Sequence, residues 1–292
     1  MPVTFRLCPQ KVLAEADFNP EGVLMLAVII AVFFAVAVGL ASSFIGGAAL
    51  TWSLTWSILT FLAFQITVGL LIRKKIIKIS LEIQNILTEG QKKLSRMVQN
   101  FQRKPQGGTA TMQKILEKEQ NAFIKSALNM VCKLAPYCKW NFMIRKQMNS
   151  MKMQFNYQLK NFEEVDSILD KCLYSDPLAV AMKMARMHTN NTPGLDKYFA
   201  KKVKKFKGEQ GTILYALYSW ALVKRGEIDA AIKILNQGKS ATGNEVLEQN
   251  WMQLVNGKVK KFSNAGLGEQ WYALYLEEPR QIKVTQPRWA SR

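Results

Sequence analysis

The pattern of apolar and polar positions divides the chain into one uncharged segment and a long polar remainder. Residues 22–72 contain no Asp, Glu, Lys or Arg. A helix needs about 20 apolar residues to cross a bilayer, so this length predicts two crossings, near residues 22–43 and 50–72. Between them stand small and polar residues that weaken a helix: Ser42, Ser43, Gly46 and Gly47. The pattern therefore predicts a transmembrane helical hairpin over residues 22–72.

The residues that flank this segment predict its orientation. Trp52 and Trp56 open the second helix, where indole rings favour the membrane–water interface. Basic residues follow it at once: Arg73, Lys74, Lys75 and Lys78. Because basic flanks stay in the cytoplasm, we expect a multi-pass protein of the bacterial inner (cytoplasmic) membrane with both termini cytoplasmic. Acidic residues within positions 1–21 disfavour a signal or transit peptide.

Small residues recur every four positions in the first predicted helix: Ala31, Ala35, Gly39, Ser43 and Gly47. Such a row lets two membrane helices pack closely. The pattern alone leaves open whether the row joins the two helices of one hairpin or two protomers. Gln65 is the one strongly polar side chain of the second helix, and a pore would need several such groups. A channel is therefore disfavoured.

A heptad-like pattern follows the membrane segment and predicts a helical stalk over residues 73–102. Its steps of three and four are typical of a coiled-coil seam, with Gly90 in one slot: Ile76, Ile79, Ile83, Leu87, Leu94, Met97 and Phe101. A single amphipathic helix on the bilayer or on the following domain is the alternative. Pro105, Gly107 and Gly108 then predict a hinge at residues 103–111.

Residues 112–279 read as successive helices, and two stretches within them share a layout. Each has the end of an apolar helix, a polar turn and an amphipathic helix, in residues 156–177 and 218–239. Lys160 and Gly226 occupy matching turn positions that are 66 residues apart. That distance is close to two periods of about 33–34 residues, which is typical of paired-helix repeats.

This layout resembles a degenerate tetratricopeptide-repeat array. Matching positions in the later stretch are Ser219, Gly226, Ile228, Ala231 and Gly238, and those in the earlier stretch are Phe162, Leu169, Cys172 and Pro177. The departures are Asn149, Met153, Val165 and Gly243. The match covers about 50–60 residues, and residues 178–211 and 244–279 fit only as helical hairpins without the family's signature. An ordinary helical bundle with two similar hairpins is the alternative.

The resemblance implies a concave platform for a peptide or a partner helix. It places Trp220, Val223 and Lys224 on the inner face of the later stretch. An aromatic ring beside a cation suits an acidic or amphipathic partner. Trp220 also fits as an ordinary core residue, because Tyr215, Tyr218 and Leu222 share its helix.

The net charge of +19 indicates that anionic molecules are candidate partners. Most of the excess follows the membrane segment, with lysines concentrated at Lys201, Lys202, Lys204, Lys205 and Lys207. These lysines, with Arg73, Lys74, Lys75 and Lys78, are candidates for contact with anionic lipid or nucleic acid. Phe206 is an aromatic that could stack on a base. Nucleic acid is disfavoured because no RNA-binding signature accompanies the lysines, and a solvated surface is the third alternative.

The sequence predicts no catalytic residue, no metal site and no cofactor. The single histidine, His188, and four cysteines without metal-ligand spacing offer poor support for such chemistry, and Glu277 and Glu278 resemble exposed helical carboxylates. The predicted class is all-α: a membrane hairpin, a stalk and an α-solenoid-like domain at 112–279, flanked by a short cytoplasmic segment at 1–21 and a basic tail at 280–292.

The function expected is that of a membrane-anchored adaptor that holds an unidentified partner protein near the lipid bilayer. The alternative is a membrane-tethered binder of nucleic acid or ribosomes that acts through the lysine-rich faces. Homo-oligomers through the membrane helices or the stalk would be compatible with either function.

Overall fold

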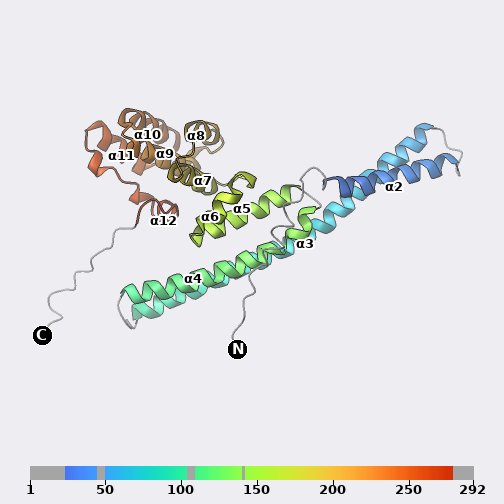
Figure 1. The fold of residues 1–292 in the computed structure, drawn as a ribbon, viewed down its shortest axis with the longest axis horizontal. Coiled ribbons are helices and arrows are strands. Elements are labelled where there is room, and N and C mark those ends of the chain that lie inside the picture. The colour runs from blue at the N-terminus through green and yellow to red at the C-terminus, as the bar shows by residue number, and fades with distance from the viewer. Residues whose placement is uncertain (1–23, 45–49, 104–108, 140–141, 279–292) are drawn as a thin grey trace. The chain divides into compact units, whose positions relative to one another are not determined.

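The computed structural model describes residues 24–44, 50–103, 109–139 and 142–278 (Figure 1). These described residues form helices and turns and contain no strand, which confirms the all-α prediction. The chain divides into two compact units after Leu173. The predicted segments 1–21 and 280–292 and most of the hinge lie outside the described residues. The predicted domain limits stay a prediction.

The first unit contains two long helical hairpins in succession. Its helices are α2 (Leu24–Phe44), α3 (Leu50–Arg103), α4 (Thr109–Cys132), α5 (Phe142–Gln158) and α6 (Phe162–Ile168), with short 3₁₀ turns η2 (Ala135–Lys139) and η3 (Leu169–Lys171). The second apolar segment and the predicted stalk form one continuous helix, because α3 runs unbroken through both. Among the described residues α3 is the one helix long and apolar enough to cross a membrane.

Small residues bring α2 against α3 within one chain (Figure 1). Ala31 is fully buried and Ala35 is 9% exposed. A Cβ atom on Gly39 would lie 2.4 Å from the Ser57 hydroxyl, so the helices cross where the small residue stands. The Ser53 hydroxyl donates to the Gly39 carbonyl at 2.6 Å. This part of the small-residue row therefore packs within the hairpin; the Ser43 side chain and Gly47 lie outside the described set.

The remaining surface of the α2–α3 hairpin is apolar and exposed. Large side chains stand outward on both helices at 46–70% exposure: Ile29, Val32, Phe33, Phe34, Val36, Leu40, Trp52, Leu54, Trp56, Ile58, Leu59, Leu62, Ile66, Leu70 and Leu71. Exposing such a surface to water would carry a large free-energy cost, whereas exposing it to hydrocarbon would not. The hairpin has the surface chemistry of a lipid-facing element.

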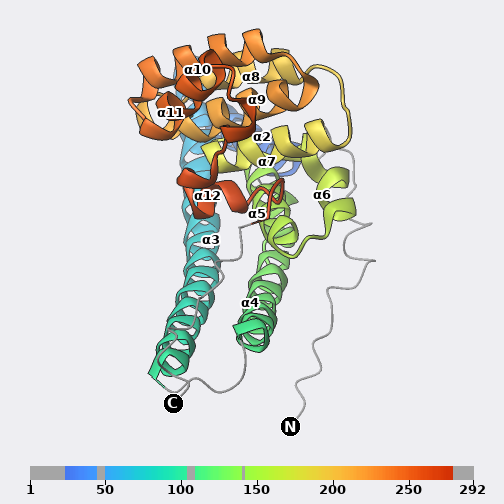
Figure 2. The same ribbon diagram turned by 90° about the vertical axis from the view of Figure 1, so that its left-hand side faces the viewer.

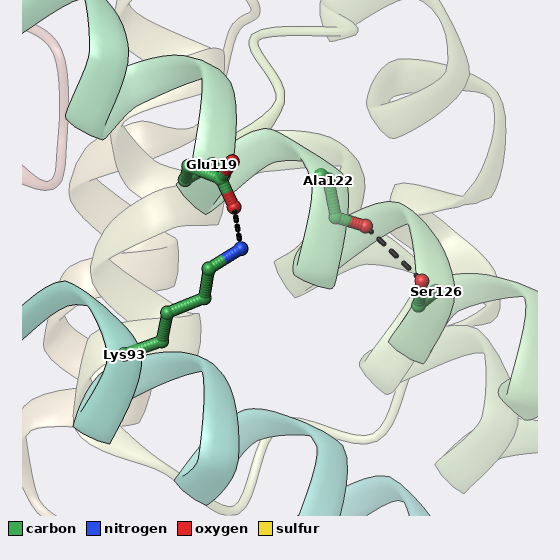
Figure 3. Close-up of polar contacts among 4 residues, drawn as sticks. All are labelled: Lys93, Glu119, Ala122 and Ser126. Carbon is green, nitrogen blue, oxygen red and sulfur yellow. Dashed lines mark hydrogen bonds and ion pairs between the residues drawn. The ribbon is translucent and has the colours of Figure 1, made fainter.

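The α4 helix folds back along the stalk part of α3, and Figures 1 and 2 show the two helices side by side. Gly90 of α3 faces the Phe123 ring, and a Cβ atom at position 90 would lie 2.5 Å from that ring. Lys93 forms an ion pair with Glu119 across the same interface (Figure 3). The glycine in the heptad seam is therefore the position that receives a large side chain from α4.

The heptad seam of α3 packs on α4 and α5 in one hydrophobic core. Ile83 is 4% exposed, and Ile76, Ile79 and Leu87 are partly buried beside it. The partners from the rest of the unit are Ile124, Ala127, Val131, Leu134, Cys138, Ile144, Met148 and Phe155. The first part of the seam that the sequence indicates, from Ile76 to Leu87, is thus packed against segments of the same chain.

The second unit is built around α9 (Thr212–Arg225), which is buried along most of its length. The α7 and α10 helices make its largest contacts. The other elements are α7 (Pro177–Thr189), α8 (Leu195–Val203), η4 (Gly208–Gly211), α10 (Ile228–Thr242), α11 (Glu245–Val255), η5 (Val259–Lys261), η6 (Ala265–Leu267) and α12 (Glu269–Tyr272).

Two helices of this unit begin at side-chain caps that the sequence encodes. The Asp176 carboxylate accepts from the Ala179 amide at 3.0 Å, directly before Pro177 in the first turn of α7. The Asn244 side chain accepts from the Val246 amide at 3.0 Å at the start of α11. Both arrangements satisfy amides that the first helical turn leaves without backbone partners.

Four helix ends share one backbone arrangement, in which a residue with positive φ follows the helix. These residues are Lys160 (φ 60°), Asn191 (φ 50°), Gly226 (φ 83°) and Gly257 (φ 69°), at spacings of 31, 35 and 31 residues. Each donates its amide to the carbonyl three residues back, and the next residue donates to the carbonyl five residues before it, at 2.8–3.1 Å throughout. This is the hydrogen-bond pattern of the Schellman motif.

The helices before these turns also share a buried position. Seven residues before each turn residue stand Met153, Met184, Ser219 and Asn250, and their exposed fractions are 0, 0, 0 and 3%. After the turn at Gly226, Ala231 is fully buried, and a Cβ atom on Gly238 would lie 2.9 Å from Tyr215. Four helices of the chain therefore end in equivalent turns with an equivalent residue inside.

Candidate functional site

The predicted partner-binding residues lie on α9 and differ in how much surface they offer. Trp220 is 7% exposed, Val223 is half-buried and Lys224 is exposed. The Lys224 ammonium lies 5.3 Å from the centre of the Trp220 ring. The aromatic ring and the cation are thus adjacent, but most of the ring faces the interior.

The Trp220 ring belongs to a cluster that closes the C-terminal part of the second unit. It meets the His188 ring at 5.2 Å and the Trp271 ring at 5.9 Å between centroids, both edge to face. Its Nε1–H donates to Glu277 Oε1 at 2.7 Å, and Trp271 Nε1–H donates to Glu277 Oε2 at 2.9 Å. One carboxylate therefore satisfies two largely buried indoles.

The description of Glu277 as an exposed helical carboxylate is wrong. Glu277 lies in a bend after α12 and is half-buried. Its partner Trp220 is 57 residues earlier in the chain, so no local spacing connects the two. The sequence indicates this contact only through chemistry, because a tryptophan within a buried helix needs an acceptor for its N–H.

His188 stands against this cluster, and its surroundings favour the neutral imidazole. Burial lowers the pKa of His188 below its usual value of 6.5, and the nearby charges of Arg225 and Lys224 lower it further. Arg225 also reaches Asp196 of α8 with an Nη1–Oδ1 distance of 3.2 Å. The exposed surface beside Trp220 consequently carries Lys224 and Arg225, with Asp196 paired to Arg225.

A buried amide network fixes the chain beside this cluster. Asn250 Nδ2 donates to Asn264 Oδ1 at 2.8 Å, and Asn264 Nδ2 donates to the Ala216 carbonyl of α9 at 3.0 Å. Asn250 Oδ1 accepts from the Ser263 amide at 3.0 Å. Because the amides satisfy one another, the network positions the segment that leads to Trp271 and Glu277.

The candidate anion-binding residues form two separate groups. Arg73, Lys74, Lys75 and Lys78 are exposed on α3, directly after the apolar part of that helix. At the end of α8, Lys202 is half-buried, whereas Lys201, Lys204, Lys205 and Lys207 are exposed. Phe206 is 8% exposed. It is buried, so the suggestion that it could stack on a nucleic-acid base is wrong.

In the described part of the chain, no group of three or more His, Cys, Asp or Glu side chains could hold a metal ion. Burial raises the pKa of the Cys138 thiol, although Arg145 and Lys152 act in the opposite direction. A thiol of that kind is less nucleophilic at neutral pH than an exposed one.

No protein-family model matches the chain, and neither a curated protein nor a solved structure shows significant similarity to it.

Proposed function

We propose that the chain is a membrane-anchored adaptor. In this proposal the α2–α3 hairpin crosses the bilayer twice, and a tetratricopeptide-like stack presents a surface to a partner protein in the cytoplasm. The observation that carries the proposal is the set of four equivalent turns at Lys160, Asn191, Gly226 and Gly257. Helix pairs repeated at this period are typical of stacked arrays, whose common role is binding other proteins.

The packing of small residues supports the array. Ala231 and Gly238 stand where α9 and α10 approach closely, and both positions exclude larger side chains. These are the positions that the tetratricopeptide resemblance identifies as small. Met153 and Val165 are buried at positions where the resemblance expects other residue types. In the earlier helix pair these positions are therefore buried as well, but by larger side chains.

The membrane part of the proposal rests on surface chemistry. The large apolar side chains of α2 and α3 point outward, and the first charged residues after them are Arg73, Lys74 and Lys75. Positive residues beside an apolar helix favour the cytoplasmic side. A bacterial inner membrane is the setting that fits this arrangement, with residues 45–49 on the opposite side.

The test is affinity capture of the full chain from native bacterial membranes, with and without nuclease. The informative variant is Val223→Ser with Lys224→Glu, because these two side chains offer surface whereas Trp220 is packed in the interior. Ile234→Ser with Lys233→Glu on α10 is the matched control, since it pairs a half-buried apolar residue with an exposed lysine.

We expect a protein partner that resists nuclease, persists with the control and is lost with the α9 variant. Partners that vanish on nuclease treatment, with RNA in the eluate, would contradict the adaptor and favour the nucleic-acid alternative. Loss of the partner with both variants would contradict the proposal that the exposed surface of α9 binds the partner.

A further inference from the structure

Two lysines and two tyrosines of the second unit converge on one point outside the Trp220 cluster. Tyr174 precedes α7, Lys183 lies on α7, and Tyr198 and Lys202 lie one turn apart on α8. The Lys183 ammonium is 5.2 Å from the centres of both tyrosine rings. The Lys202 ammonium is 5.4 and 5.5 Å from the same two centres.

The two rings form the frame that holds the ammonium groups together. Tyr174 and Tyr198 meet edge to face with centroids 6.4 Å apart. Cation–π attraction to shared rings draws both lysines to the same place, although like charges repel there. The framework is fixed because Tyr198 and Lys202 share one face of a helix and the preceding α7 packs against it.

The electrostatics of Lys202 agree with this crowding. Burial lowers the pKa of the Lys202 ammonium, and Lys205, Lys183 and Lys201 lower it further. Every charged group that shifts it is another lysine. An anion between Lys183 and Lys202 would remove this repulsion and would accept hydrogen bonds from both ammonium groups.

We propose that Lys183 and Lys202, framed by Tyr174 and Tyr198, bind the phosphate of an anionic glycerophospholipid headgroup. Ammonium groups bind phosphate as point charges, and tyrosine suits the boundary between headgroups and acyl chains. The choice of a lipid source rests on the proposed membrane attachment, because an anchored domain meets headgroups at high effective concentration. It does not depend on the adaptor role.

Nucleic acid fits these residues less well than a lipid headgroup. Sequence-tolerant binding of single strands uses aromatic faces on which bases stack. The Tyr174 and Tyr198 rings already contact two lysines and each other, and Phe206 is buried. The group therefore offers positive charge without an open stacking face.

The first experiment measures lysine acylation in the full chain, reconstituted in nanodiscs of phosphatidylcholine alone or with 30% phosphatidylglycerol. Mass spectrometry reports the labelling rate of each lysine with an N-hydroxysuccinimide ester. We expect phosphatidylglycerol to slow the acylation of Lys183 and Lys202 by about threefold or more. A bound anion would block both nitrogens and favour their protonated, unreactive form. Lys233 on α10 and Lys258 after α11 are exposed controls whose rates should stay unchanged.

Further arms separate the sources of phosphate. Inorganic phosphate, glycerol 3-phosphate and a single-stranded oligonucleotide are each added to phosphatidylcholine nanodiscs. Protection by either small phosphate that equals protection by the lipid would overturn the lipid assignment in favour of a free phosphate. Protection by the oligonucleotide in place of the lipid would overturn it in favour of nucleic acid. A chain that fails to enter nanodiscs would count against the membrane anchor of the proposed function and would remove the basis for a lipid source.

Charge-neutral variants complete the test in solution. Lys183→Gln with Lys202→Gln should weaken binding of dihexanoyl phosphatidylglycerol to the detergent-solubilised chain by about tenfold or more. Lys183→Arg with Lys202→Arg should retain binding, which also shows that the site tolerates substitution. Lys233→Gln with Lys258→Gln removes the same charge elsewhere. Equal weakening by both glutamine pairs would overturn the proposal, because the binding would then follow net charge alone.

Discussion

At the scale of single residues, the heptad seam of α3 depends on one missing side chain. Gly90 is buried and lies against the Phe123 ring of α4. Glycine lowers helix stability in most positions, and here the close contact with an aromatic ring offsets that cost. A residue that weakens the helix in isolation thus joins α3 to α4.

We predict that Gly90→Ala destabilises the chain by about 1–3 kcal/mol, because the new methyl group would overlap Phe123. Gly69→Ala in the apolar part of α3 is the control: no atom lies within 4 Å of its Cβ position. It should be neutral or stabilising by up to about 1 kcal/mol. Thermal unfolding of the detergent-solubilised chain measures both. Equal stability of the two variants would disprove the close contact.

The single histidine provides a second prediction at this scale. Because the pKa of His188 is lowered in the folded chain, the unfolded chain binds more protons as the pH falls. Its contribution to stability is therefore complete above the unfolded pKa near 6.5 and is lost as the pH falls below that value. We expect Tm to drop more between pH 7.5 and 5.5 in the wild type than in His188→Gln.

Histidine-selective NMR gives an independent reading of the same group, since the chain has one histidine. A pKa at or above 6.5 in the folded chain, or an equal drop of Tm in the variant, would contradict the account of its environment.

At the scale of elements, the four turns after α5, α7, α9 and α11 share one backbone geometry. Two turns use glycine, and two use Lys160 and Asn191 at positive φ. A left-handed conformation costs a residue with a side chain about 1–2 kcal/mol relative to glycine. Substitutions at the two glycine turns should therefore change the free energy of unfolding differently from substitutions at Lys160 and Asn191.

We predict that Gly226→Ala and Gly257→Ala each destabilise the chain by about 1 kcal/mol. Lys160→Gly and Asn191→Gly should change stability by less than about 0.5 kcal/mol, because relief of backbone strain offsets the greater flexibility of glycine. Urea unfolding of the four variants gives the comparison. A marked loss at Lys160→Gly, with none at Gly226→Ala, would contradict a shared turn geometry.

The sequence was informative about these elements to different degrees. The turns at Lys160 and Gly226 were visible because similar residues surround them, whereas those at Asn191 and Gly257 lack the signature and share only backbone geometry. The stalk seam was visible as steps of three and four, but the same pattern suits any helical partner. Only the fold identifies α4 and α5 as that partner. The contact between Trp220 and Glu277 depends on long-range folding and has no local signal.

At the scale of the whole molecule, the chain combines an apolar helical hairpin with a highly basic remainder. The hairpin closes on itself through Ala31, Ala35 and Gly39, and its large apolar side chains are exposed. The first part of the α3 seam, from Ile76 to Leu87, is likewise packed within the chain. In the described part of the chain, both long helices therefore pack against segments of the same chain.

The central claim, a double crossing with both termini on the cytoplasmic side, is tested most directly by cysteine accessibility in bacterial spheroplasts. Gly47→Cys places a thiol between the two apolar helices, and Lys118→Cys places one at an exposed site of α4. A membrane-impermeant maleimide should label Gly47→Cys in intact spheroplasts, and Lys118→Cys only after permeabilisation. The unchanged chain, with its native cysteines, reports background labelling. Labelling of Lys118→Cys in intact spheroplasts, or protection of Gly47→Cys there, would contradict the account.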